Sequence, residues 1–164
     1  MLEMNSREDE LKNGIWIYGL AGSGKTFASK LVAKQIPSAF LIDGDIVRRH
    51  ISFDLGYTKT EREIQLKRLL GLGILAFGNK LFPIISSVTM NEYIADECQK
   101  SNFLLLRIER NMRQLRAVRS LYDLEKNVVG VDQVLPNIDT DSIFNDGTDK
   151  FKKEVDDYVR STLY

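Results

Sequence analysis

Five short apolar runs recur along the chain, separated by longer stretches that mix polar and apolar residues. The runs lie at residues 15–20, 39–43, 82–88, 102–108 and 137–140. Short runs that are apolar on both faces are typical of buried strands, and the stretches between most of them are long enough for helices. Strands that alternate with helices predict βαβ units with right-handed crossovers. The predicted fold class is therefore α/β, a doubly wound sheet of about five parallel strands flanked by helices.

Two of the helical stretches have distinctive patterns. Residues 60–77, after Thr58, read TEREIQLKRLLGLGILAF and predict one long helix. Residues 149–163 carry apolar side chains at positions 151, 155, 158, 159 and 163, which is the spacing of an amphipathic helix. We expect this last helix to cover the sheet.

The length and composition fit one globular domain. A chain of 164 residues can bury one sizeable core, and 43% hydrophobic with 28% charged residues is usual for a globular protein. We therefore predict a single domain over residues 1–164, in which the polar segment 1–13 is a flexible N-terminal extension.

Charge, cysteine content and hydropathy indicate which partners and which cellular compartment to expect. Lys plus Arg equals Asp plus Glu, at 23 residues each, so no net positive charge draws the chain to nucleic acid or an anionic membrane. The single cysteine, Cys98, excludes an internal disulfide and is expected to be a buried small hydrophobic residue. The polar N-terminus has no apolar leader, and the longest apolar run is far shorter than a membrane span. We expect a cytoplasmic protein that binds neither nucleic acid nor membrane, with a homodimer left open.

The first strand leads into GLAGSGKT, which matches the phosphate-binding pattern G-x-x-x-x-G-K-[ST]. A helical stretch, FASKLVAKQI, follows in the required order. Glycines allow successive backbone N–H groups to point at phosphate oxygens, Lys25 reaches the β- and γ-phosphates, and Thr26 offers a hydroxyl to Mg²⁺. The predicted cofactors are ATP and Mg²⁺, and the predicted ATP-binding residues of this segment are Gly19, Leu20, Ala21, Gly22, Ser23, Gly24, Lys25, Thr26 and Phe27.

The second strand ends in DGDIVRR, residues 43–49. Because the carboxyl ends of parallel strands lie at one edge of the sheet, Asp43 and Asp45 are expected beside the phosphate-binding loop. Asp43 then suits the water shell of Mg²⁺ and Asp45 suits a substrate hydroxyl, although the residues leave open which of them contacts the metal. The alternative is a solvated turn, for which Asp and Gly are well suited. The predicted catalytic residues are Lys25, Asp43 and Asp45, and the predicted metal ligands are Thr26 and Asp43.

Basic residues follow these acids. Arg48 and Arg49 come directly after them, and the next predicted helix carries Arg62, Lys67 and Arg68. Guanidinium groups bind phosphate or sulfate in a bidentate manner, so the cluster indicates an anionic acceptor. The alternative is a solvated basic helix face.

A second basic series has one arginine every third residue. On a helix this spacing drifts by about 60° per step, so the side chains cannot all face one ligand. One or two of them are expected in a lid over the nucleotide, where a guanidinium can stack on a base or neutralise transferring charge. The series consists of Arg107, Arg110, Arg113, Arg116 and Arg119.

Five blocks of the chain resemble the adenylylsulfate kinases, and the resemblance covers nearly the whole chain. The blocks are GLAGSGKT, LIDGDIVRR, DLGYTKTEREIQLKR, RSLY and NVVGVD, and they follow in the family's order and spacing. Those enzymes are ATP-dependent kinases with the P-loop NTPase fold, and they phosphorylate the ribose 3′-hydroxyl of adenosine 5′-phosphosulfate. The resemblance therefore implies a kinase whose small-molecule acceptor is an anionic nucleotide.

The resemblance also implies roles for individual residues. Arg48 and Arg62 would hold the anionic tail of the acceptor, while Asp45 would lie nearest the attacking hydroxyl. Tyr57 would stack on the acceptor base and Gln65 would hydrogen-bond it. Arg116 matches an arginine that lies on the adenine of ATP, and Arg119 replaces a lysine near the acceptor. The implied acceptor site comprises Asp45, Arg48, Tyr57, Arg62, Gln65, Ser86, Arg119 and Val128.

The chain departs from the family at the acceptor site. Val128 stands where the family has a phenylalanine that forms one side of the clamp on the acceptor base. Residues 88–91 read VTMN where the family has ISPY, and the lid after Tyr122 is several residues shorter. A base–aromatic stack contributes ~1–3 kcal/mol, so a valine disfavours an adenine clamp. An offshoot of the family that phosphorylates cytidine diphosphoramidate in bacterial capsule synthesis fits these changes equally well, and both acceptors are left open.

Two other classes of protein share part of the pattern. A small-metabolite kinase, of the gluconate or shikimate type, has the P-loop and similar acids, but DLGY and the helix of Arg62 favour a nucleotide acceptor. A non-catalytic nucleotide-binding regulator is the second alternative. It is disfavoured because the guanine-reading N-K-x-D pattern is absent, whereas Lys25, Thr26, Asp43 and Asp45 are all present.

Overall fold

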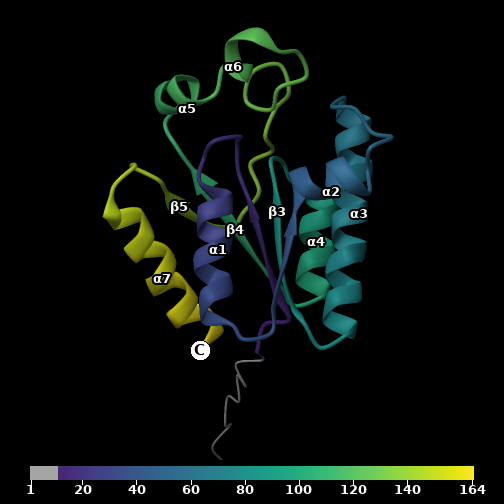
Figure 1. The fold of residues 1–164 in the computed structure, drawn as a ribbon, viewed down its shortest axis with the longest axis vertical. Coiled ribbons are helices and arrows are strands. Elements are labelled where there is room, and N and C mark those ends of the chain that lie inside the picture. The colour runs from purple at the N-terminus through teal and green to yellow at the C-terminus, as the bar shows by residue number, and fades with distance from the viewer. Residues whose placement is uncertain (1–10) are drawn as a thin grey trace, which may run out of the picture.

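The computed structural model describes residues 11–164, whose strands form one parallel sheet (Figure 1). Its spatial order is β2-β3-β1-β4-β5, and each neighbouring pair is parallel. The chain winds in opposite directions from β1, which puts a ligand-binding crevice at the carboxyl end of that strand. The predicted α/β class is confirmed. The strands are β1 (Gly14–Tyr18), β2 (Ala39–Asp43), β3 (Phe82–Ser87), β4 (Phe103–Glu109) and β5 (Asp141–Phe144).

Among the described residues, four helices cover the two faces of the sheet, and two short helices, α5 (Met112–Val118) and α6 (Leu121–Leu124), lie above its carboxyl edge (Figure 1). One face carries α1 (Lys25–Gln35) and α7 (Asp149–Leu163), and the other carries α3 (Lys59–Gly78) and α4 (Glu92–Lys100). The short helix α2 (Gly44–His50) links β2 to α3. The helices α5 and α6, together with the segment 125–133 that follows them, are called the lid. Within residues 11–164, no helix has the length and apolar character needed to cross a membrane.

The central strand β1 joins two hydrophobic cores. Ile15 and Ile17 pack toward α1 and α7, whereas Trp16 and Tyr18 pack toward α3 and α4. All four side chains are fully buried, and burial of a large apolar side chain contributes roughly 1.5–3 kcal/mol. Trp16 Nε1 also donates to Ser87 Oγ at 2.8 Å, which fixes the end of β3 beside β1. The two cores hold the carboxyl ends of the central strands in register.

Both helices with distinctive patterns are confirmed. Helix α3 begins after Thr58, whose hydroxyl accepts from Glu61 N–H while the Glu61 carboxylate accepts from Thr58 N–H. This capping box satisfies N–H groups that the first turn leaves free. Helix α7 spans residues 149–163 and buries Phe151, Val155 and Val159 against the sheet.

The predicted fifth strand at residues 137–140 is wrong. That segment is irregular, and the strand is β5 at Asp141–Phe144. This edge strand pairs with β4 alone and buries one side chain, Ile143, so it does not need the continuous apolar run of a central strand. The Thr140 hydroxyl donates to Leu105 O at 2.5 Å, which brings the irregular segment onto β4.

The expected flexible segment at residues 1–13 lies mostly outside the described residues. Its last part is anchored, because Lys12 Nζ donates to Asn102 Oδ1 at 2.9 Å and Asn13 N–H donates to Asn102 O at 3.0 Å. Lys12 and Asn13 are therefore held against Asn102, which differs from the prediction for these two residues.

Cys98 lies on α4 and is 1% exposed, in the core between α4 and the sheet. Burial raises the pKa of its thiol to about 12, so the thiol is protonated at neutral pH. The prediction of a buried hydrophobic cysteine is confirmed.

Candidate active site

Residues 19–24 form the loop between β1 and α1, and two of its positions have backbone conformations that favour glycine. Gly22 and Gly24 have φ angles of 82° and 110°, in the left-handed region that residues with a side chain rarely adopt. A Cβ on Gly24 would also lie 2.6 Å from Asn145 Nδ2. Gly24, Lys25 and Thr26 line a cavity, so the free N–H groups at the start of α1 are directed to a site that suits phosphate.

Lys25 lies between the phosphate-binding loop and the acids that follow β2. Its Nζ donates to Leu20 O at 3.0 Å, across the loop. Burial lowers the pKa of this ammonium to about 8, although the nearby carboxylates of Asp45 and Asp43 act to raise it. A buried cation of this kind is stabilised when anionic phosphate oxygens bind beside it.

The pKa of Lys25 predicts that ATP affinity depends on pH. Above about pH 8 the free protein has lost this proton and must take it up when ATP binds. We therefore expect calorimetry to show affinity falling above pH 8, by up to about tenfold per pH unit, with proton uptake on binding. Lys25→Arg stays charged in this range and should bind with a flat pH profile. An affinity of the wild-type protein that is constant from about pH 7 to 10 would contradict this interpretation.

The lowered pKa of Lys25 makes ATP affinity fall with rising pH, but it has the opposite effect on the free energy of unfolding. The unfolded chain keeps the Lys25 proton up to its ordinary pKa of 10.5, whereas the folded chain loses it at about 8. Between these values the unfolded state binds more protons, so this group makes the free energy of unfolding rise with pH.

Asp43 and Asp45 reach the site through the register of the sheet and the start of α2. Asp43 is the last residue of β2 and pairs with Ser86, which also pairs with Ile17 of β1. Asp43 Oδ1 accepts from Asp45 N–H at 2.9 Å and from Ile46 N–H at 3.2 Å, and so caps α2. The alternative of a solvated turn at DGD is wrong, because the second half of this motif is the first turn of a helix.

One end of the cavity is built around Tyr57. The guanidinium carbon of Arg48 lies 4.6 Å from the centre of the Tyr57 ring, and that of Arg62 lies 5.3 Å from it. Arg48 Nη1 donates to Gly56 O at 2.5 Å, which fixes the arginine against this loop. Gln65 is 5% exposed, and its Nε2 donates to Gly44 O at 3.1 Å. Two cations and an aromatic ring therefore meet at one end of the cavity.

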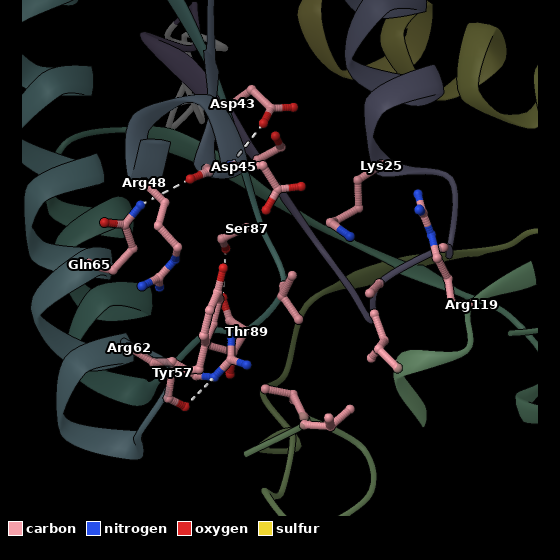
Figure 2. Close-up of a pocket in the computed structure, with 18 of the residues that line it drawn as sticks. Lys25, Asp43, Asp45, Arg48, Tyr57, Arg62, Gln65, Ser87, Thr89 and Arg119 are labelled. Carbon is pink, nitrogen blue, oxygen red and sulfur yellow. Dashed lines mark hydrogen bonds between the residues drawn. The ribbon is translucent and has the colours of Figure 1, made fainter. Parts of the chain in front are cut away.

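A cavity of about 430 Å³ brings most of the predicted residues together. Asp43 and Asp45 lie between Lys25 and Arg119 on one side and the Arg48, Arg62 and Tyr57 group on the other (Figure 2). The arrangement places the P-loop, two carboxylates and a group of two guanidinium side chains and a tyrosine ring around one space. The predicted site residues that line it are Ala21, Gly22, Gly24, Lys25, Thr26, Asp43, Asp45, Arg48, Tyr57, Arg62, Gln65, Ser86, Arg119 and Val128.

Four predicted ATP-binding residues of the loop region lie outside this lining. Gly19 N–H donates to Ser87 O at 3.2 Å, and Ser23 is fully buried. Leu20 packs in the small core under the lid, and Phe27 is half-exposed with its ring 6.0 Å from that of Phe151. None of these four residues lines the cavity, and their contact with ATP stays a prediction.

The arginine series does not form one helix. Arg107 lies on β4 and pairs with Glu109 at 3.2 Å, whereas Arg110 follows β4 and its Nη1 donates to Gly22 O at 3.1 Å. Arg116 lies on α5 and faces Asp123 of α6, with Nε and Oδ1 3.8 Å apart. Arg119 is the member of the series that lines the cavity, so the contact of Arg116 with adenine stays a prediction.

Three of the basic residues expected near the acceptor, Arg49, Lys67 and Arg68, do not line the cavity. Arg68 forms a bidentate pair with Asp54, with distances of 2.6 and 2.8 Å. Lys67 Nζ lies 5.5 Å from the centre of the Tyr93 ring on α4. Neither residue lines the cavity, so the alternative of a solvated helix face holds for this part of α3.

Val128 has two environments. It is 5% exposed and packs with Leu115 and Tyr122 in the core under the lid, yet it also lines the cavity. The Tyr122 hydroxyl donates to Ala21 O and so joins this core to the phosphate-binding loop. A larger side chain at Val128 must therefore fit both the core and the cavity.

Three groups of lining residues were not predicted from the sequence. Ser87 ends β3 and is followed by Val88 and Thr89, α3 contributes Leu66 and Leu69, and the lid contributes residues 121, 125–127 and 129. The first group could have been found, because β3 is the neighbour of β1 and its carboxyl end lies in the crevice. The lid residues have no local signal, since only the fold of the lid brings them over the cavity.

The oxygen ligands present suit Mg²⁺. Thr26 offers a hydroxyl, and Asp43 and Asp45 offer carboxylates, in one cavity beside the loop. Over residues 11–164, no cluster of three or more His, Cys, Asp or Glu side chains is placed to hold a metal by itself. Mg²⁺ that is bound with nucleotide keeps waters and phosphate ligands and needs few protein groups, so this set fits the ion.

The fold and the site define a protein of the P-loop NTPase class. The loop between β1 and α1, the carboxylates after β2 and the sheet order are the features of this class. Residues 12–133 match the family model described as adenylylsulphate kinase. The chain therefore belongs to the adenylylsulphate kinase family.

The chain is also similar in sequence to individual adenylyl-sulfate kinases. The adenylyl-sulfate kinase of Synechococcus sp. (strain JA-3-3Ab) is 27% identical over 116 residues, which is 66% of each chain. That of Halothermothrix orenii is 33% identical over 79 residues, 46% of this chain and 43% of its own. The chain thus aligns with less than two thirds of the length of these relatives.

A solved structure supports the fold. The structure of the Mycobacterium tuberculosis APS kinase CysC in complex with AMPPNP and APS has a TM-score of 0.75 to this chain and 18% sequence identity. The similarity covers 92% of this chain and 96% of the other. It establishes that the two chains share the P-loop NTPase fold.

Proposed function

We propose that the protein is an ATP-dependent kinase that transfers the γ-phosphoryl group of MgATP to the ribose 3′-hydroxyl of an anionic nucleotide. One observation carries the proposal: a single cavity is lined by the phosphate-binding Lys25, the carboxylate of Asp45 and the guanidinium pair of Arg48 and Arg62. Phosphoryl transfer needs mainly positioning and charge stabilisation, and these groups supply both.

Each group has a role in an in-line transfer. Lys25 and the loop N–H groups stabilise charge on the β- and γ-phosphates, and Asp45 orients the acceptor hydroxyl. Arg48 and Arg62 hold the anionic tail of the acceptor beside Tyr57. Thr26 and Asp43 would hold Mg²⁺, which neutralises phosphate charge when it is bound.

Two acceptors fit the site. The names of the relatives support adenosine 5′-phosphosulfate, since they are adenylyl-sulfate kinases. The buried Val128 supports a smaller base with a longer tail, such as cytidine diphosphoramidate, because no second aromatic ring stands there to clamp adenine.

An ADP-release assay tests the proposal with both acceptors in parallel. We expect ADP release that depends on ATP, on Mg²⁺ and on one of the two nucleotides. Gluconate and shikimate serve as control acceptors for the small-metabolite alternative. Turnover with gluconate or shikimate and with neither nucleotide would show that the acceptor is a small metabolite. Nucleotide binding without turnover of any acceptor would favour a non-catalytic regulator.

Substitution of Val128 by phenylalanine tests the acceptor base. If the ring enters the cavity, it should form a second stacking surface with Tyr57 and raise the preference for adenylylsulfate over the cytidine acceptor by about 5- to 150-fold. The packing against Leu115 and Tyr122 should cost about 1–3 kcal/mol of the free energy of unfolding. The checks are kcat/KM for both acceptors and Tm, and a lower Tm with unchanged preference would reject Val128 as a specificity residue.

A further inference from the structure

A small hydrogen-bond network joins the Tyr57 loop to the lid. The backbone carbonyl of Tyr57 accepts from Gln133 Nε2 at 2.8 Å and from Arg62 Nε at 3.1 Å. Arg62 Nη2 also donates to Asn127 O of the lid at 2.8 Å. Because Arg62 lies on α3 and Gln133 lies on the lid, two separate segments hold the same carbonyl group.

Gln133 is fixed within the lid by its own backbone. Its N–H donates to Val128 O at 3.1 Å, and its carbonyl accepts from Gly130 N–H at 2.7 Å. The carboxylate of Asp132 accepts from the N–H groups of Asn127 and Val128, at 2.7 and 2.5 Å. The segment 127–133 is thus a closed turn, and the Gln133 side chain extends from it to Tyr57.

The chemistry of the contact fixes the orientation of the amide. A backbone carbonyl only accepts hydrogen bonds, so Gln133 must present its NH₂ group to Tyr57. The donor therefore has a defined role that a side chain of equal length without N–H cannot fill.

The contact lies next to the acceptor side of the cavity. The Tyr57 ring is 54% exposed and lines the cavity together with Arg48 and Arg62, whose guanidinium groups lie over it. A shift of the Tyr57 backbone would move the ring relative to both cations (Figure 2). Gln133 is not part of the lining, so it acts on this group through Tyr57 and through a longer contact of 3.5 Å from its Nε2 to Asn127 Oδ1.

We propose that Gln133 is a positioning residue for the acceptor. It holds the Tyr57 backbone against the lid and thereby sets how well the cavity binds the acceptor nucleotide. The inference rests on the proposed kinase function and adds a residue that controls acceptor affinity without touching ATP or the transferred phosphoryl group.

Gln133→Met keeps the side-chain length and removes the donor. With the acceptor that the wild-type protein phosphorylates, the acceptor KM should rise by about 2- to 12-fold, the range for the loss of one net hydrogen bond. The KM for ATP and kcat should stay unchanged, and Gln133→Lys, which restores a donor, should return the acceptor KM toward the wild-type value. Val134→Ala is the matched control, because this neighbouring side chain is 86% exposed.

Hydrogen exchange on the nucleotide-free protein tests the contact independently of activity. The N–H groups of Leu55, Gly56 and Thr58 donate to Ser52 O and to the Glu61 carboxylate, so exchange reports the order of this loop. We expect faster exchange at residues 55–58 in Gln133→Met than in the wild-type or Val134→Ala proteins. Exchange equal to wild type, or an unchanged acceptor KM, would overturn the inference. Faster exchange in a protein that phosphorylates neither nucleotide would support the contact and reject the proposed function.

Discussion

Replacement of Lys25 by alanine is expected to lower kcat by ~10²-fold or more while the protein stays folded. The ammonium lies beside the phosphate-binding loop and near Asp45 and Asp43, where charge must be stabilised as the γ-phosphoryl group moves. Folding should be preserved because burial disfavours this charge, as the lowered pKa shows, so removing it relieves an unfavourable term. Steady-state kinetics and Tm are the measurements.

Lys30→Ala provides the matched control for Lys25. Lys30 lies on the same helix, α1, but is exposed and does not line the cavity. It should leave kcat and both KM values unchanged. A near-normal kcat for Lys25→Ala would show that the phosphate-binding loop does not take part in the reaction.

Asp45→Asn should give the second large effect, a loss in kcat of ~10²-fold or more with little change in the KM for ATP. Asparagine keeps the shape of the side chain and removes the negative charge that orients the acceptor hydroxyl. The cap of α2 is formed by Asp43, so this substitution should leave the helix intact.

Asp43→Asn separates the roles of the two acids. Asparagine caps helices as well as aspartate does, so α2 should be retained while the charge near the metal is lost. We expect a higher Mg²⁺ requirement and a higher KM for ATP. If Asp45→Asn instead affected only ATP binding, the roles assigned to Asp43 and Asp45 would have to be exchanged.

Local signals explain which parts of the site could be predicted. Gly24 needs a left-handed backbone, Lys25 follows it directly, and α1 begins there, so the loop is specified by consecutive residues. Asp43 could be placed for a different reason, because the last residue of a parallel strand must lie at the carboxyl edge of the sheet. Its second role as the cap of α2 also has a local signal, because Asp is a preferred N-cap residue and a helix follows it directly.

Contacts between distant segments explain the failures. The arginine spacing could not show which member faces the cavity, because Arg107 lies on β4, within the strand predicted at residues 102–108, and only the fold of the following segment brings Arg119 to the cavity. Arg68 was placed near the acceptor because its partner, Asp54, is 14 positions away and gives no helical spacing. Gln133 gave no signal, since its role depends on the fold that brings the lid to Tyr57.

The position of the transferred phosphoryl group tests the proposed function most directly. The wild-type protein is incubated with ATP, Mg²⁺ and each acceptor nucleotide, and phosphorus and proton NMR identify the product. The account predicts one equivalent of ADP and a nucleotide that carries a new phosphate on the ribose 3′-oxygen, with no product from the matching 3′-deoxy acceptor. A phosphate at another position, or hydrolysis of ATP with no phosphorylated nucleotide, would contradict it.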